Sequence, residues 1–201
     1  MPFLKQQIQL VNQELLESTL KDARFQPGRF EAIAVDVSRT TATGGTETFP
    51  AVMSDNYEAQ EITVNDTYPI SIYHKLLNKT YSPAATSGNY GNGNPSVICK
   101  ADIKMVVYGK YTKLKLTTEQ LEALITTGFP DLISREKLSP YKLDTMTVNL
   151  QSSNLNSAAV FAEEYKGFEP FLAPEDILFS IKYTIESRYR KNCFTICDCI
   201  D

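Results

Sequence analysis

The strongest constraint on the fold is an alternating pattern near the end of the chain. Between residues 177 and 189, apolar residues occupy every second position from 177 to 185, and polar residues occupy most of the other positions. Because successive side chains of a β-strand point to opposite faces of a sheet, this pattern predicts a long antiparallel strand with one buried face. The residues expected on the buried face are Phe179, Ile181, Tyr183 and Ile185. Those expected on the opposite face, open to solvent or a partner, are Lys182, Thr184 and Glu186.

Two segments have the apolar spacing of amphipathic helices. Residues 3–23 carry apolar residues at intervals of three and four, which predicts an N-terminal helix that lies against a sheet or a neighbouring subunit. Residues 118–127 predict a second helix. Thr117 is in the N-cap position, Gln120 is placed to complete a capping box, and Gly128 follows the last helical turn.

The remaining strands are expected in between. They are predicted at 33–37, 49–53, 61–64, 97–108 and 145–150, with a polar loop at 38–46. Residues 68–77 predict an edge strand or a connecting segment, because Pro69 has no N–H to donate to a ladder. Together these elements predict an α+β fold, mainly an antiparallel sheet with the two helices packed on one face. At 201 residues the chain is expected to form a single domain, 1–201.

The segment at 82–96 is the most irregular part of the sequence. It is rich in glycine and asparagine, which favour turns, and it contains few groups that pack. Loops of this length inside compact domains are uncommon, so it is interpreted as either a contact arm or a mobile insertion. It is expected to contribute little to domain stability.

Composition argues against several classes of partner. A formal net charge of −4 gives no general electrostatic footprint for nucleic acid or an anionic membrane. No apolar run approaches the roughly 20 residues that cross a bilayer, and the N-terminus has no signal-peptide pattern. A protein that is not secreted, with no membrane partner and no sequence-specific nucleic acid partner, is therefore expected.

The sequence offers few candidates for catalysis. His74, the single histidine, has no nearby serine or cysteine motif and is interpreted as a surface or partly buried structural residue. The acidic pairs Glu163–Glu164 and Glu175–Asp176 are interpreted as solvated charge, since adjacent side chains point in different directions. We therefore predict no catalytic residues.

Cofactor and metal sites are also not predicted. Cys193, Cys197 and Cys199 have a spacing unlike paired zinc knuckles, which favours structural or incidental thiols over metal or redox use. The glycines at 88, 91 and 93 do not form a nucleotide-binding motif. The triplets at 65–67 and 78–80 match the glycosylation motif by chance, and the basic cluster Arg188, Arg190 and Lys191 is interpreted as a solvated strand end.

The order of the elements resembles the small α+β tail-terminator and head-to-tail connector proteins of tailed bacteriophages. The resemblance rests on the 103–108 strand followed by the 118–127 helix, and on the closing 179–189 strand. It implies a structural virion protein, made in the cytoplasm of the bacterial host, that forms a ring between the portal and the tail. Its partners would be other copies of itself and neighbouring portal, connector or tail proteins, and no catalytic residues would be expected.

Two alternatives remain open from the residues alone. A bacterial adaptor or accessory subunit could use the same kind of fold. An enzyme whose site is scattered along the sequence is the other alternative, because a single sequence carries no local trace of such a site.

Overall fold

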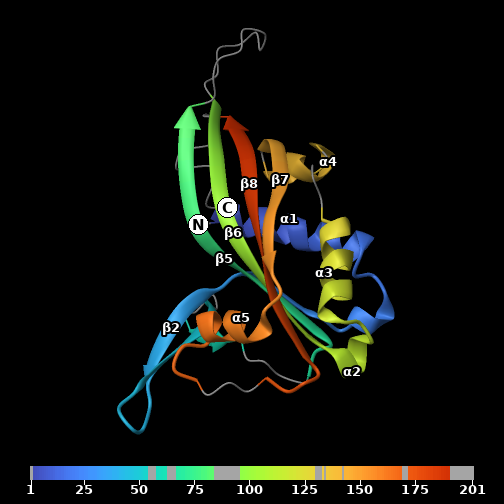
Figure 1. Cartoon of the computed structure of the whole chain (residues 1–201). Coiled ribbons are helices and arrows are strands. Elements are labelled where there is room, and N and C mark those ends of the chain that lie inside the picture. Colours follow the sequence, from blue (N-terminus) through green and yellow to red (C-terminus); the bar gives the residue numbers. More distant parts are fainter. Residues whose placement is uncertain are drawn as a thin grey trace.

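The computed structural model describes residues 2–53, 58–62, 67–83, 96–129, 133, 135–141, 143–168 and 172–190. The fold is α+β, as predicted: a large sheet lies between a layer of helices and a second, smaller layer of strands and one helix (Figure 1).

The large sheet has five strands in the order β1-β5-β6-β8-β7. In that order the strands are Arg29–Ile33, Ile70–Pro83, Ser96–Lys110, Asp176–Arg190 and Leu143–Asn154. Only β1 runs parallel to its neighbour, and every other pair is antiparallel. The predicted strands at 97–108, 145–150 and 177–189 are therefore confirmed as β6, β7 and β8.

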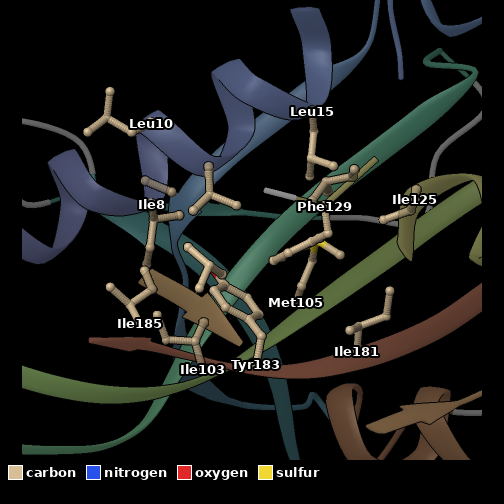
Figure 2. Close-up of a cluster of buried hydrophobic side chains, with 14 of the residues drawn as sticks. Ile8, Leu10, Leu15, Ile103, Met105, Ile125, Phe129, Ile181, Tyr183 and Ile185 are labelled. Carbon is tan, nitrogen blue, oxygen red and sulfur yellow. The ribbon is translucent and has the colours of Figure 1, made fainter. Parts of the chain in front are cut away.

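One face of the large sheet is covered by helices. These are α1 (Pro2–Ser18), α2 (Tyr111–Leu114), α3 (Thr118–Thr127) and α4 (Arg135–Leu138), with 3-10 turns at Ala23–Phe25 and Ser139–Tyr141. Between helices and sheet lies the main core, in which Ile8 and Leu15 of α1 meet Ile103, Ile181 and other strand residues (Figure 2). The burial of this face drives the packing of the helices, because it removes a continuous apolar surface from water.

The four residues predicted on the buried face of the last strand are confirmed there. Phe179, Ile181, Tyr183 and Ile185 are each at most 1% exposed and belong to the main core. The strand has the predicted register, because odd-numbered residues of β8 and β6 face each other on the helix side.

The N-terminal helix is shorter than predicted. The expected range was 3–23, but α1 ends at Ser18, and Asp22 then caps a 3-10 turn by accepting a hydrogen bond from Arg24 N–H at 2.9 Å. Aspartate favours such local caps over helix interiors, which explains the early break. Leu20 remains fully buried after the helix has ended.

The capping box of α3 is confirmed in both directions. Thr117 N–H donates to Gln120 Oε1 at 2.9 Å, and Gln120 N–H donates to Thr117 Oγ1 at 3.3 Å. Gly128 follows the helix where the end of α1 passes closely, since a Cβ atom there would lie 1.5 Å from Thr19 Oγ1. A side chain at this position would push α1 and α3 apart.

The second layer covers part of the face that was predicted to be open. It consists of the antiparallel strands β2 (Val35–Thr40), β3 (Thr46–Met53) and β4 (Ala59–Glu61), and of α5 (Ser157–Glu164). Its apolar residues pack on even-numbered positions of the large sheet, such as Val106 and Leu178. The prediction of a sheet with one fully open face was therefore wrong for this half.

Four local predictions differ from the structure or lie partly outside the described residues. The predicted 33–37 strand is divided between β1 and β2, and Ser38–Thr40 belongs to β2 where a loop was expected. The predicted 61–64 strand is described only through Ile62, because residues 63–66 lie outside the described part. The first half of β5 is not an edge, since β1 and β6 flank it, and Pro69 precedes the strand. Of the predicted 82–96 loop, residues 84–95 lie outside the described residues, while β5 reaches Pro83 and β6 begins at Ser96.

Candidate interaction surface

The part of the large sheet beyond the second layer exposes a polar face. We call it the open face, and no other element within the described ranges covers it. It contains Asn78, Thr80 and Ser82 of β5; Ile98, Lys100 and Asp102 of β6; Lys182, Thr184, Glu186 and Arg188 of β8; and Thr145, Thr147, Asn149 and Gln151 of β7. The open face therefore spans four strands at the end of the sheet away from α5 (Figure 1).

The strand register arranges these side chains in transverse rows. Lys100 stands directly opposite Glu186, and Thr80 and Thr147 continue the same row on the outer strands. Side chains directly opposite each other in antiparallel strands are close enough to interact. The row therefore places a base beside an acid, both exposed, with hydroxyl groups on either side.

Thr184 differs from the prediction for this face. It is only 4% exposed, although it points away from the helices. Its hydroxyl donates to Asp102 Oδ1 at 2.8 Å and accepts from Gln151 Nε2 at 2.5 Å. The expectation that Thr184 is solvated was wrong, because Gln151 reaches across from the β7 bulge and covers it.

His74 lies on the opposite, helix-covered side of the sheet and is completely buried. Its Nε2 donates to Asn12 Oδ1 at 2.8 Å, since a carbonyl oxygen only accepts, and its Nδ1 accepts from the Tyr183 hydroxyl at 2.9 Å. The Asn12 amide donates in turn to Glu31 O at 3.3 Å. Burial lowers the pKa of His74 to about 3 and raises the pKa of Tyr183 well above its usual value. The prediction of a surface or partly buried histidine was wrong about exposure.

The acidic pair Glu163–Glu164 is not solvated charge as predicted. Glu164 has a fully buried side chain whose Oε2 contacts Lys75 Nζ at 2.6 Å and whose Oε1 contacts Lys104 Nζ. Glu163 is exposed at the rim and accepts from Lys104 Nζ at 2.7 Å. Asp36 of β2 contacts Lys75 Nζ from the other side. We call these five residues the ionic cluster, and it joins α5 and β2 to the middle of the large sheet.

The electrostatics of the ionic cluster follow from burial and pairing. The hydrogen bond from Lys104 lowers the pKa of Glu163. Desolvation alone would lower the pKa of Lys104, but the hydrogen bonds to Glu163 and Glu164 raise it above its usual value. Tyr73 donates its hydroxyl to Glu164 Oε2 at 3.1 Å, and burial raises the pKa of Tyr73 well above the usual range. The cluster thus keeps its charges paired and fixed.

The second acidic pair, Glu175–Asp176, is also only partly solvated. Asp176 has a side chain 2% exposed, and its Oδ1 accepts from Lys110 Nζ at 2.5 Å and from the Tyr108 hydroxyl at 2.9 Å. Its Oδ2 accepts from Ala173 N–H at 2.7 Å. The interpretation as solvated charge was therefore wrong for Asp176. This carboxylate fixes the turn that leads into β8.

Sequence reasoning overlooked the lysines that neutralise these acids. Lys75, Lys104 and Lys110 are all at most 8% exposed. One feature indicates them: Lys104 interrupts an apolar run in a strand, and a lysine is almost never fully buried unless it is paired. The sequence carries no indication of which acid is the partner.

Several predicted features lie outside the described residues. These are Cys193, Cys197, Cys199, Lys191, the glycines at 88, 91 and 93, the 65–66 positions of one glycosylation triplet, and the side chain of Arg190. Asn78 of the other triplet is exposed on β5. Cys99 is a buried free cysteine. Within the described ranges, no three histidine, cysteine, aspartate or glutamate side chains are grouped as metal ligands would be.

In the part of the chain that the structure describes, every helix is too short or too polar to cross a membrane. The sequence matches no model of a known protein family, and no curated protein sequence matches it.

Proposed function

We propose that this chain is a structural subunit of a bacteriophage virion and forms a ring in the head-to-tail connector or the tail. It acts through protein–protein contacts with other copies of itself and with neighbouring portal, connector or tail proteins. The observation that supports the proposal is the open face, a sheet surface four strands wide that lies beyond the second layer.

The chemistry of the open face suits reversible assembly. Interfaces between proteins that first fold separately are about as polar as the rest of the surface. The open face meets this description, because Lys100 and Glu186 stand opposite each other among hydroxyl and amide groups. Such a surface tolerates water before assembly and offers directional contacts to a partner afterwards.

The rigidity of the surface supports the same function. The hydrogen bonds through Thr184 hold Asp102 and Gln151 in fixed positions. The ionic cluster and the main core fix the sheet from both sides at its other end. Groups that are already ordered lose less entropy when a partner binds, so the contact costs less free energy.

The test is the state of association of the purified full chain and of the native particle. We expect native mass spectrometry and electron microscopy to show a closed ring of identical subunits. The variants Lys182→Ala and Glu186→Ala should weaken association, because both side chains are exposed on the open face. Their unfolding by urea should be almost unchanged.

Lys5→Ala and Glu119→Ala are the matched controls, since these charges are exposed on α1 and α3. They should leave association unchanged. A chain that stays monomeric at every concentration and forms no ring in any particle would refute the proposal. A stable complex with a small molecule instead of protein partners would also refute it.

A further inference from the structure

The large sheet has two edges that lack a partner strand for part of their length. The last residue of β5 that pairs with β1 is His74, and within the described ranges no strand pairs with the outer edge of β5 from Leu76 onward. At the opposite edge of the sheet, Ile133 N–H donates to Met146 O of β7 at 3.2 Å. From Thr147 onward, β7 also lacks a described partner strand on its outer side.

Each of these free edges exposes a leucine at a bulge. Leu77 is 50% exposed, and the register of β5 against β6 shifts between its two neighbours, Leu76 and Asn78. Leu150 is 40% exposed, and the register of β7 against β8 shifts directly after it. Because bulges redirect side chains and bend the strand, they place these two leucines at the margin of the sheet.

Leu150 lies in the same transverse row as Leu76, the residue directly before Leu77. Leu76 stands opposite Ile103, Ile103 opposite Tyr183, and Tyr183 opposite Leu150. Leu77 follows Leu76 directly in the chain. A second copy displaced sideways along this row by the width of the sheet would therefore bring its Leu150 beside Leu77 of the first copy.

The strand directions agree with this displacement. β5 and β8 are both antiparallel to β6, and β7 is antiparallel to β8, so β5 and β7 run in opposite directions. In two copies that face the same way, β5 of one would lie antiparallel to β7 of the next. Antiparallel strands form the perpendicular hydrogen-bond pattern that already joins most of this sheet.

We infer that the sheet continues from one copy to the next, with residues 76–79 of β5 beside residues 147–150 of the second copy and Leu77 packed against its Leu150. This inference rests on the proposed ring and names its contact. Because two different edges meet, every copy keeps one edge free for a further copy. Such a heterologous contact closes into a ring when the rotation between copies divides a full turn.

The test replaces the two leucines by charged residues in the full chain and measures association by native mass spectrometry. The double variant Leu77→Lys/Leu150→Lys places two like charges in the contact and should lower the association constant by at least about tenfold. The double variant Leu77→Lys/Leu150→Glu places opposite charges there and should restore much of the loss. Met53→Lys is the control, because Met53 is 44% exposed but lies on β3 in the second layer.

Recovery in the Lys/Glu variant would show that the loss of association in the Lys/Lys variant does not come from misfolding caused by Leu77→Lys, since both variants contain that change. If the unaltered chain forms rings and the Lys/Lys variant forms them equally well, the edge contact is refuted while the proposed function stands. If the unaltered chain forms no ring in solution or in particles, the proposed function fails and the edge contact fails with it.

Discussion

The single histidine makes the pH dependence of stability unusually easy to interpret. His74 is neutral in the folded chain, because burial lowers its pKa from 6.5 to about 3. In the unfolded chain it takes up a proton below its ordinary pKa of about 6.5. The contribution of His74 to the free energy of unfolding is therefore fully present above that pH and is lost as the pH falls toward the pKa of the folded state.

The magnitude follows from these two pKa values. Between about pH 7.5 and pH 5, proton uptake by His74 in the unfolded chain alone should lower the free energy of unfolding by about 2 kcal/mol. Tyr183, which donates to His74, does not titrate in the window, since burial raises the pKa of Tyr183 well above its usual value. Hydrogen bonds from a lysine or arginine lower the pKa values of Glu17, Asp22 and Glu163, away from the window.

The assay is urea unfolding at several pH values and one protein concentration. The control is His74→Gln, which keeps a donor and an acceptor but cannot gain a proton. We expect the free energy of unfolding of the variant to fall by about 2 kcal/mol less than that of the unaltered chain between about pH 7.5 and pH 5, because only the unaltered chain has the histidine that takes up the proton. A loss below about 0.5 kcal/mol in the unaltered chain, or an equal slope in His74→Gln, would refute the reasoning.

The remaining predictions concern single substitutions measured by urea unfolding. Ile181→Ala should cost about 2 to 5 kcal/mol because it leaves a cavity in the main core, whereas Glu186→Ala should cost under about 0.5 kcal/mol; equal losses would contradict the register of β8. Thr184→Ala should cost about 1 to 3 kcal/mol, since it removes a buried hydroxyl that two groups share. Glu164→Gln should cost about 3 to 5 kcal/mol by removing the fully buried carboxylate that Lys75 and Lys104 share, and Glu163→Gln, at the exposed rim, under about 1 kcal/mol. Similar effects at the two glutamates would contradict the ionic cluster.

The sequence predicted the elements whose cause is local. The alternation of β8 predicted which of its residues face the main core, because a strand has a side-chain period of two. The capping box formed by Thr117 and Gln120 marked the start of α3, since both partners lie within one helical turn. Asp22, in contrast, ended α1 early through a local cap that apolar spacing alone did not reveal.

The open face was predicted only in part. Its polar residues on β8 follow from the same alternation, and Lys182 and Glu186 are exposed as expected. How far the face extends depends on where β2, β3 and α5 pack, and this packing joins segments from different parts of the chain. The pairing of Leu150 with the row of Leu76 also depends on the order of strands in the sheet.

Tertiary structure alone decided the state of the titratable residues. The partners of His74 are 62 and 109 positions away, and Tyr73 is 91 positions from Glu164. Alternation and helical spacing report contacts within an element, so they carry no information about such pairs. The sequence by itself therefore determined the α+β elements and the buried face of β8. Which charges are buried, and where the sheet remains open, was decided only when distant segments packed together, because burial and pairing are properties of that packing.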